Sequence, residues 1–214
     1  YDSATDMQIG TYTITKKNVT VENFDYVLTA KDYNTQEQPI EVTAKAGIVG
    51  LGTITVKYNG STEVPVNVGT YNVTVDIATG ANYDSATDMQ IGTYTITKKV
   101  VTVKADNKSS VYGDALVELT YTVDDGILVG NDDKTALGIT LVKEDGLTVG
   151  NYAITGTSNS ANYDVTVEPA NYEITRRTPV LSDLVYDLTS KQYTGEAQGL
   201  TITADENLAG FGDI

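Results

Sequence analysis

The sequence contains no cysteine, histidine or tryptophan among its 214 residues. The absence of cysteine excludes disulfide bonds, thiolate nucleophiles and cysteine-ligated metals. The absence of histidine excludes a Ser-His-Asp triad, an imidazole base and histidine metal ligands. Because the side chains most often used in catalysis are absent, we expect the chain not to be an enzyme and to need no cofactor.

Positive charge is also scarce, with 14 lysines and arginines against 29 aspartates and glutamates and a net charge of −15. Such an acidic surface repels phosphate groups, so we expect no nucleic-acid partner and no docking on anionic lipid. Acidity of this degree keeps an exposed protein soluble and favours a monomer. No apolar run approaches the roughly 18 residues of a membrane span, which predicts no membrane insertion.

The composition that is present is typical of strands, with many β-branched residues and 15 tyrosines against two phenylalanines. Tyr71, Val73 and Val75 alternate with polar residues, which places the apolar side chains on one face of a strand. The same alternation occurs at Ile40, Val42 and Ala44 and at Ile54, Val56 and Tyr58. Between these runs, Asn59-Gly60 favours a tight hairpin. Since no sustained helical stripe is present, we predict an all-β fold without substantial helix.

The stretch YDSATDMQIGTYTITKK occurs twice, at residues 1–17 and again, letter for letter, at residues 83–99. This duplication predicts a tandem array, in which residues 1–17 are the C-terminal strands of a truncated type-A module and residues 18–99 are a whole type-A module. Residues 100–177 form a diverged type-B module that also ends in Tyr-x-Ile-Thr and two basic residues. Residues 178–214 repeat the start of type A without a gap and are the N-terminal part of a further truncated module.

The two truncated modules do not complete one another. Together they lack a counterpart of residues 55–82, so joining them head to tail between two molecules leaves a gap in the sheet. We therefore expect the chain to be a piece of a longer array. The matches in the tail extend to its end, where Gly210, Gly212 and Ile214 fall 160 residues after Gly50, Gly52 and Ile54.

The two whole modules have 82 and 78 residues, with turn signals at short intervals between the strands. Modules of this kind are predicted to be small β-sandwiches. A Lys-Lys or Arg-Arg pair is followed at once by the next strand, which leaves almost no linker. Neighbouring modules of the chain should therefore abut and form an elongated rod. We interpret the duplicated stretch as the closing strand pair of each module and its hinge to the next.

Several short motifs follow one another in the type-B module: SVYGDA at residues 110–115, LTY at 119–121, VGNYAITG at 149–156, and then NYDV and NYEIT. As a set, these motifs resemble the MBG domain of the Tyr-Gly-x type. The type-A motifs KDYNTQEQPIEV, VKYNGSTEVPVNVGTYNVTV and GTYTITKK resemble the related bacterial surface repeats of the YDG and MBG domains. Type A departs from that pattern at Asp32-Tyr33-Asn34, where a glycine often follows the tyrosine, and the tail restores a glycine in Tyr193-Thr194-Gly195.

This resemblance implies an immunoglobulin-like or β-grasp-like sandwich, repeated in large bacterial proteins that are secreted, attached to the cell wall or of the adhesin type. An extracellular location is therefore expected. In such proteins the repeats act as a stalk or spacer, and some are linked to the binding of host glycans or proteins. The family carries no catalytic residues, so none is transferred to this chain.

Tyrosines recur at matching positions of the modules, as Tyr33 and Tyr193, Tyr71 and Tyr152, Tyr83 and Tyr163, and Tyr12, Tyr94 and Tyr172. One hypothesis is that exposed rings stack on sugars, with Tyr33, Tyr58 and Tyr193 as the ligand-binding candidates. The alternative is that each ring packs at the sandwich edge and bonds the backbone through its hydroxyl, as in a tyrosine corner. The position of these residues at strand starts favours packing.

Acidic residues gather in one loop region of type B, where Asp124, Asp125, Asp132 and Asp133 are candidate Ca²⁺ ligands. Their spacing does not follow the Asp-x-Asp-x-Asp-Gly pattern of calcium loops. A solvated acidic turn is therefore the favoured interpretation.

Two further chemistries are weighed and disfavoured. Lysines beside predicted strands offer Lys–Asn isopeptide crosslinks, but most lysines point to water; they are Lys31, Lys57, Lys104 and Lys143. The acid pair Glu144-Asp145 is compatible with glycoside hydrolysis, but modules composed mostly of strands have little chain left to build a cleft.

Two functions therefore remain open. The first is a structural spacer that projects another part of a bacterial protein away from the surface. In the second, the modules themselves bind a host or matrix glycan or protein. The neighbouring modules of the same chain are the partners expected in both.

Overall fold

The structure is a computed structural model and describes residues 1–205. Its regular elements are strands together with three short 3-10 helices, and no α-helix occurs among the described residues. The prediction of an all-β fold is therefore confirmed. Within residues 1–205, no helix is long and apolar enough to cross a membrane.

Fifteen strands follow one another along the described chain. The type-A region holds η1 (Val21–Asn23), β1 (Phe24–Tyr26), β2 (Lys31–Asp32), β3 (Val42–Ala44), β4 (Ile54–Tyr58), β5 (Gly69–Ile77) and β6 (Ala86–Thr97). The type-B region holds β7 (Lys99–Ala105), β8 (Lys108–Val111), β9 (Tyr121–Thr122), η2 (Lys134–Leu137), β10 (Ile139–Lys143), β11 (Gly150–Ser158), β12 (Tyr163–Glu168) and β13 (Ala170–Thr175). The tail holds η3 (Leu181–Asp183), β14 (Leu184–Tyr186) and β15 (Ile202–Ala204).

The type-A strands form a four-stranded sheet in the order β2-β6-β5-β4 and a two-stranded sheet of β1 and β3. β5 lies between β4 and β6 and is antiparallel to both, whereas β2 runs parallel to β6. Along β5 the predicted alternation is present, because Val73, Val75 and Ile77 are buried and the residues between them are more exposed. This burial holds the sheet on the core.

The predicted hairpin at Asn59-Gly60 is also present. Asn59 has a φ of 49° and Gly60 a φ of 83°, both in the left-handed region that this tight turn requires. Two backbone hydrogen bonds close the turn: Tyr58 N donates to Ser61 O at 2.7 Å and Ser61 N donates to Tyr58 O at 3.0 Å. The turn therefore sets the end of β4.

The type-B strands form two sheets, in the orders β10-β11-β13-β8 and β12-β7-β9. The first strands of the region run parallel to the last ones, since β7 pairs with β12 over six residue pairs and β8 pairs with β13 over four. Pro169 lies between β12 and β13, and the chain changes from one sheet to the other there. Proline has no N–H for a ladder, which suits this corner.

The closing strand pair predicted for each module is present in type B, as β12 and β13, but the duplicated stretch in type A is one strand. β6 spans Ala86–Thr97 and pairs with β5, with register irregularities near Val73 and Val75 of β5. The first copy behaves differently: residues 1–16 form no strand, and Lys17 makes a single bridge to Tyr83. The same letters thus form a long strand only where β5 lies beside them.

The tail repeats the start of type A in structure as well as in sequence. β14 pairs with β15 so that Leu184 lies opposite Ala204, as Phe24 lies opposite Ala44 in β1 and β3. Leu184 and Ala204 lie 160 positions after Phe24 and Ala44, respectively. The last predicted matches, Gly210, Gly212 and Ile214, lie outside the described residues.

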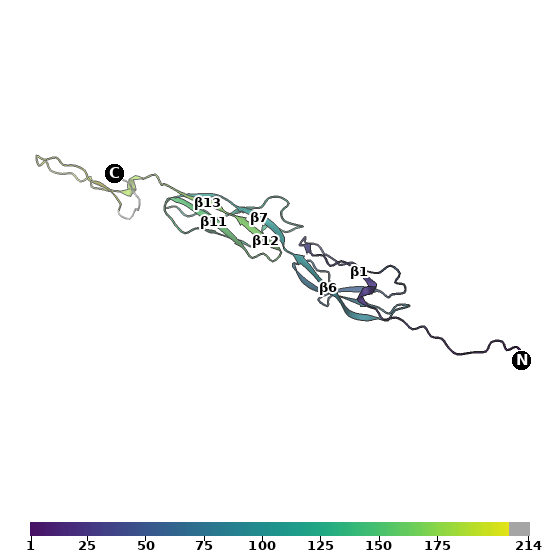
Figure 1. Ribbon diagram of the computed structural model, residues 1–214. Helices are drawn as coiled ribbons and strands as arrows, with labels where there is room; N and C mark the ends of the chain where they lie inside the picture. The colour runs from purple at the N-terminus through teal and green to yellow at the C-terminus, as the bar shows by residue number, and fades with distance from the viewer. Residues whose placement is uncertain (206–214) are drawn as a thin grey trace.

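The largest core cluster continues from the type-A into the type-B region. It joins Tyr33 and Ile96 to Val101, Leu137 and Tyr163, all of them buried. A smaller cluster inside type B consists of Ala105, Ile154, Tyr172 and Ile174. In Figure 1 the strands β1–β6 and β7–β13 follow one another along the chain. The largest cluster takes members from both groups of strands.

Candidate functional site

The structure brings together two residues that the sequence placed in different hypotheses, a sugar-stacking tyrosine and a calcium-binding aspartate. The Tyr33 hydroxyl donates to Asp132 Oδ2 at 3.1 Å, and the Tyr163 hydroxyl donates to the same oxygen at 2.8 Å. The two rings meet edge to face, with centroids 5.7 Å apart and planes at 80°. We refer to Tyr33, Asp132 and Tyr163 as the junction site.

The two tyrosines of the junction site are buried, and burial raises the pKa of both. Tyr33 is 6% exposed and Tyr163 is 1% exposed. Burial, and then the bond to the Asp132 carboxylate, raises the pKa of Tyr33 above its ordinary value. Burial likewise raises the pKa of Tyr163 to about 12, although the Val129 backbone N–H that donates to its hydroxyl acts in the opposite direction. Both tyrosines therefore remain protonated donors at neutral pH.

Local backbone structure positions each member of the junction site. Tyr33 follows β2, and its N–H donates to Thr97 O at the end of β6 at 2.9 Å. Asp132 precedes η2, whose first turn is capped by Asp133 through a 2.8 Å bond from Thr135 N. The bonds from Thr135 hold the pKa of Asp133 below its usual value. Leu137, at the end of η2, is fully buried and anchors this loop in the core.

Gly130 permits the close approach of the two regions. Its φ of 57° lies in the left-handed region, and a Cβ added there would collide with the Thr35 side chain. Any other residue at this position would both strain the backbone and push the type-A loop away.

A second group of contacts lies beside the junction site. Asn162 Oδ1 accepts from Val68 N at 3.2 Å, and Asn162 Nδ2 donates to Asn67 Oδ1 at 3.4 Å. Lys98 Nζ donates to Ser160 O at 2.7 Å. Lys98 is the single residue between β6 and β7, so the two regions are held both by the chain and by side-chain contacts.

The same backbone joint occurs at the start of type A. Lys17 N donates to Asn82 O at 2.9 Å, as Lys99 N donates to Asn162 O at 3.0 Å. The carboxylate, however, belongs to type B alone. Three residues separate Gly50 from Ile54 at the start of β4, whereas eight separate Gly130 from Ile139 at the start of β10. The longer segment carries Asp132.

Tyr58, Tyr71 and Tyr152 lie as the packing alternative predicts. Tyr58 is 4% exposed, and its hydroxyl accepts from Ile40 N at 2.7 Å. Tyr71 and Tyr152 donate to the carbonyl oxygen four residues earlier, at 2.8 and 2.7 Å. The rings of Tyr33 and Tyr58 therefore offer no face to a sugar, and the stacking hypothesis does not apply to them. Tyr193, by contrast, is 92% exposed.

The four candidate calcium ligands do not gather into a site. Asp124 and Asp125 belong to an exposed turn in which Ile127 N donates to Asp124 O at 3.4 Å. Asp132 faces the two tyrosines and Asp133 caps η2. Within the described part of the chain, no group of three or more acidic side chains is placed to hold a metal ion.

The candidate crosslinking lysines are engaged elsewhere or exposed. Lys57 forms ion pairs with Asp76 at 2.5 Å and Asp88 at 3.1 Å. Lys143 Nζ lies 3.9 Å from the centroid of the Tyr152 ring. Lys31 and Lys104 are exposed. In residues 1–205 none of the four lysines forms a hydrogen bond with an asparagine side chain.

Comparison with known proteins agrees with the arrangement of two successive modules. Residues 17–100 match the family described as MBG domain, and residues 101–175 match the family described as MBG domain (YGX type). No curated protein matches the chain, and no solved structure does. The resemblance inferred from the sequence motifs is thus confirmed. The chain belongs to the MBG-domain family, with two MBG domains in succession over residues 17–175.

Proposed function

We propose that the chain is part of a structural spacer, in which MBG domains in tandem form an elongated stalk that holds another part of a bacterial protein away from the cell surface. Domains of this family occur in bacterial surface proteins, which supports an extracellular role. The net charge of −15 supports it too, because acidity keeps a long exposed chain soluble and unassociated.

The observation that carries this proposal is the shared core at the junction site. A change of angle between the two domains would separate Tyr33 of type A from the Asp132 oxygen and the Tyr163 ring of type B. A buried hydroxyl that loses its partner costs about 1–3 kcal/mol, so bending is opposed. The single linking residue, Lys98, leaves little slack for another arrangement. In Figure 1 the purple N-terminal segment and the yellow-green tail extend from opposite ends of the pair of domains.

We further infer that the chain has no catalytic role. The sequence contains neither histidine nor cysteine. The buried acid Asp183 bonds to Arg177 at 2.7 Å, and Asp132 is occupied by two tyrosines. In a spacer, buried carboxylates such as Asp132 and Asp183 serve only to stabilise the fold.

Orientation measurements by NMR on the whole chain test the spacer role. Residual dipolar couplings from amides of β5 and β6 and from amides of β7, β11 and β13 should fit one alignment tensor. Asp132→Ala should divide the data into two tensors, whereas Asp145→Ala, at an exposed acid in the β10–β11 connection, should not. Two independent tensors in the unchanged protein would contradict the proposal.

A second candidate function is that the domains bind host glycans or a matrix protein. The occurrence of this family in bacterial surface proteins motivates it. The 92% exposure of Tyr193 does not by itself favour a sugar site, because its counterpart Tyr33 is buried by β6 and by Tyr163, and the tail has no counterpart of these neighbours. A glycan array or mucin pull-down with the whole chain tests this function. Binding that Tyr193→Ala abolishes would contradict a pure spacer, and absence of binding would leave the spacer as the function.

A further inference from the structure

The first strand of the type-B domain is only partly paired along one edge. β7 pairs with β12 from Lys99 to Lys104, but it pairs with β9 at Lys104 and Ala105 alone. The earlier part of β7 therefore has a neighbour on one side only.

The backbone groups of Val100 and Thr102 point to this open side. Successive residues of a strand direct their N–H and C=O groups to opposite edges. Lys99 N donates to Asn162 O beside β12, and Asp106 N donates to Thr120 O beside β9. Even-numbered residues of β7 therefore face the β9 edge. Val100 and Thr102 lie there beyond the end of β9, and no turn or loop of the described chain bonds their backbone groups.

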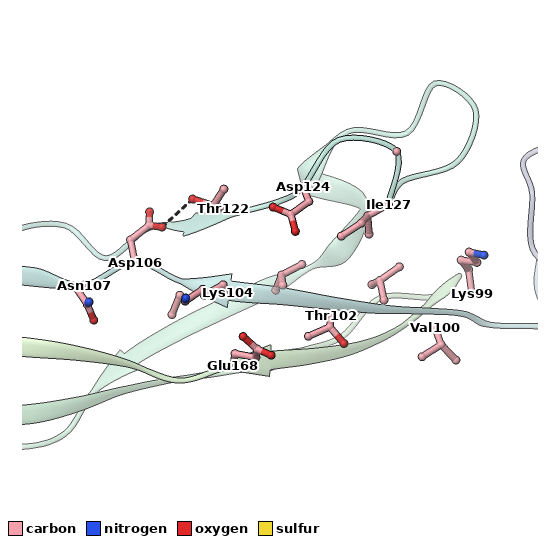
Figure 2. A pocket seen from close by; sticks show the side chains of 14 residues that line it. Lys99, Val100, Thr102, Lys104, Asp106, Asn107, Thr122, Asp124, Ile127 and Glu168 are labelled. Atoms are coloured by element: carbon pink, nitrogen blue, oxygen red, sulfur yellow. Dashed lines mark hydrogen bonds between the residues drawn. The ribbon is translucent and has the colours of Figure 1, made fainter.

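The turn that contains Asp124 and Asp125 is the reason that the edge is open. If β9 continued in register, Asp124 would lie opposite Thr102 and Gly126 opposite Val100. Instead Gly126 adopts a φ of 79°, and Ile127 N donates to Asp124 O at 3.4 Å. In Figure 2 the chain after Thr122, the last residue of β9, turns away from the edge of β7 and forms an arch over β7. The result is a groove of about 770 Å³ between this arch and β7.

The groove has an apolar inner side, and charged side chains line the rest of it. Val101 and Val103 point into the core, and Ile127 packs against it from the arch. On the outer side Val100 is 69% exposed, beside the exposed Thr102. The charged residues that line the groove are Asp106, Asp124 and Glu168 together with Lys99 and Lys104, as Figure 2 shows. An incoming strand would thus meet apolar groups on one face and, along the groove, three carboxylates against two lysines, within a chain of net charge −15.

We propose that this groove binds an extended, basic peptide segment of another protein, which adds to β7 as a strand in the place where β9 ends. The open N–H and C=O groups of Val100 and Thr102 bond its backbone, and alternate apolar side chains contact Ile127. Lysine or arginine side chains between them face Asp124 and Glu168, and the net charge of −15 attracts such a segment from a distance. This role goes beyond that of a spacer and does not depend on it.

A second copy of the chain is a poorer occupant for the same reason. Two molecules that each carry −15 repel one another, and each would bring the same acidic groove to the contact. A basic partner removes that repulsion.

NMR titration of the ¹⁵N-labelled whole chain tests the proposal. The probe is a ten-residue peptide in which lysine alternates with valine and threonine. Shift changes should centre on the amides of Val100, Thr102 and Ile127. A peptide with glutamate in place of lysine should bind at least about tenfold more weakly. A lysine peptide N-methylated on its bonding edge should lose at least about tenfold as well, because it lacks the donors of the added strand.

Matched variants separate this groove from unspecific attraction. Val100→Lys combined with Thr102→Lys places repelling charge at two exposed positions, so the fold is kept and binding should fall at least about tenfold. Val142→Lys, at an exposed position of β10, should leave binding unchanged. Equal binding by the Val100→Lys, Thr102→Lys variant, or equal binding of the glutamate peptide, would overturn the proposal. Concentration-dependent dimerisation through β7 without peptide would assign the groove to a second copy and overturn it too.

Discussion

The Tyr33 hydroxyl bonds Asp132 Oδ2 at 3.1 Å although the two lie 99 positions apart in the sequence. They belong to different MBG domains, and Tyr163 bonds the same oxygen. Because Asp132 lies in a segment that is longer in type B than in type A, this contact distinguishes the type-A to type-B joint from a joint between two type-A domains. The joint between these two domain types is therefore more than a covalent link.

Asp132→Ala should lower the free energy of unfolding by about 2–4 kcal/mol, because two buried hydroxyls lose their acceptor. Calorimetry or urea denaturation of the whole chain measures this loss. The matched control is Asp125→Ala, at an exposed acid of the neighbouring turn, which should change stability by less than about 0.5 kcal/mol. Equal effects of the two substitutions would show that the junction site does not stabilise the protein.

Stability should fall in strongly alkaline solution. The folded state raises the pKa of Tyr163 from 10.0 to about 12, so the protonated ring is the form that folding favours. Its contribution is complete below pH 10.0 and is lost as the pH rises through about 12. The loss is on the order of 3 kcal/mol, from 1.36 kcal/mol for each of about two units of pKa. Urea denaturation across this pH window measures it, and Tyr163→Phe should show a shallower decline. An unchanged slope in that variant would contradict the assignment.

Gly130→Ala should destabilise the joint for two reasons, its φ of 57° and the Thr35 side chain beside it. The conformational part alone costs about 1–2 kcal/mol. Gly113→Ala isolates that part, since Gly113 has a φ of 88° and no atom within 4 Å of an added Cβ. Denaturation of both variants should show the larger loss for Gly130→Ala. Adding Thr35→Gly should recover the difference, because it removes the colliding side chain; no recovery would mean that the contact is not the cause.

The intact mass of the chain should equal the mass calculated from its sequence. Lys57 and Lys143 are held by carboxylates, carbonyl groups and a tyrosine ring, not by asparagine. No isopeptide bond is therefore expected, and mass spectrometry of the purified chain checks this. A deficit of one ammonia per domain would contradict the described placement of these lysines.

Local sequence patterns predicted the parts of the fold that depend on near neighbours. The alternation in β5 and the Asn59-Gly60 hairpin are both present, because each follows from strand pleating or turn geometry within a few residues. The duplicated stretch shows the limit of such reasoning. Residues 83–99 contain β6, whereas the identical residues 1–17 contain no strand. Pairing with β5 makes the difference, and no pattern inside the stretch contains it.

The junction site was only half visible in the sequence. Tyr33 and Asp132 both stood out, one by its repetition and the other by its acidic neighbours, but as parts of unrelated hypotheses. Their contact depends on how two domains meet, which neither alternation nor motif spacing encodes. One signal was available: comparison of the modules after Gly50 and Gly130 shows extra residues in type B, and those residues contain Asp132.

The parallel pairing of first and last strands has a mechanical consequence. A pull along the chain enters the type-B domain near Lys99 and leaves it near Thr175. Because β7 lies parallel to β12 over six pairs and β8 parallel to β13 over four, the tension slides neighbouring strands past one another. The backbone hydrogen bonds between these strands are then loaded together in shear and do not break one after another. A domain built in this way is suited to carry load along its own chain.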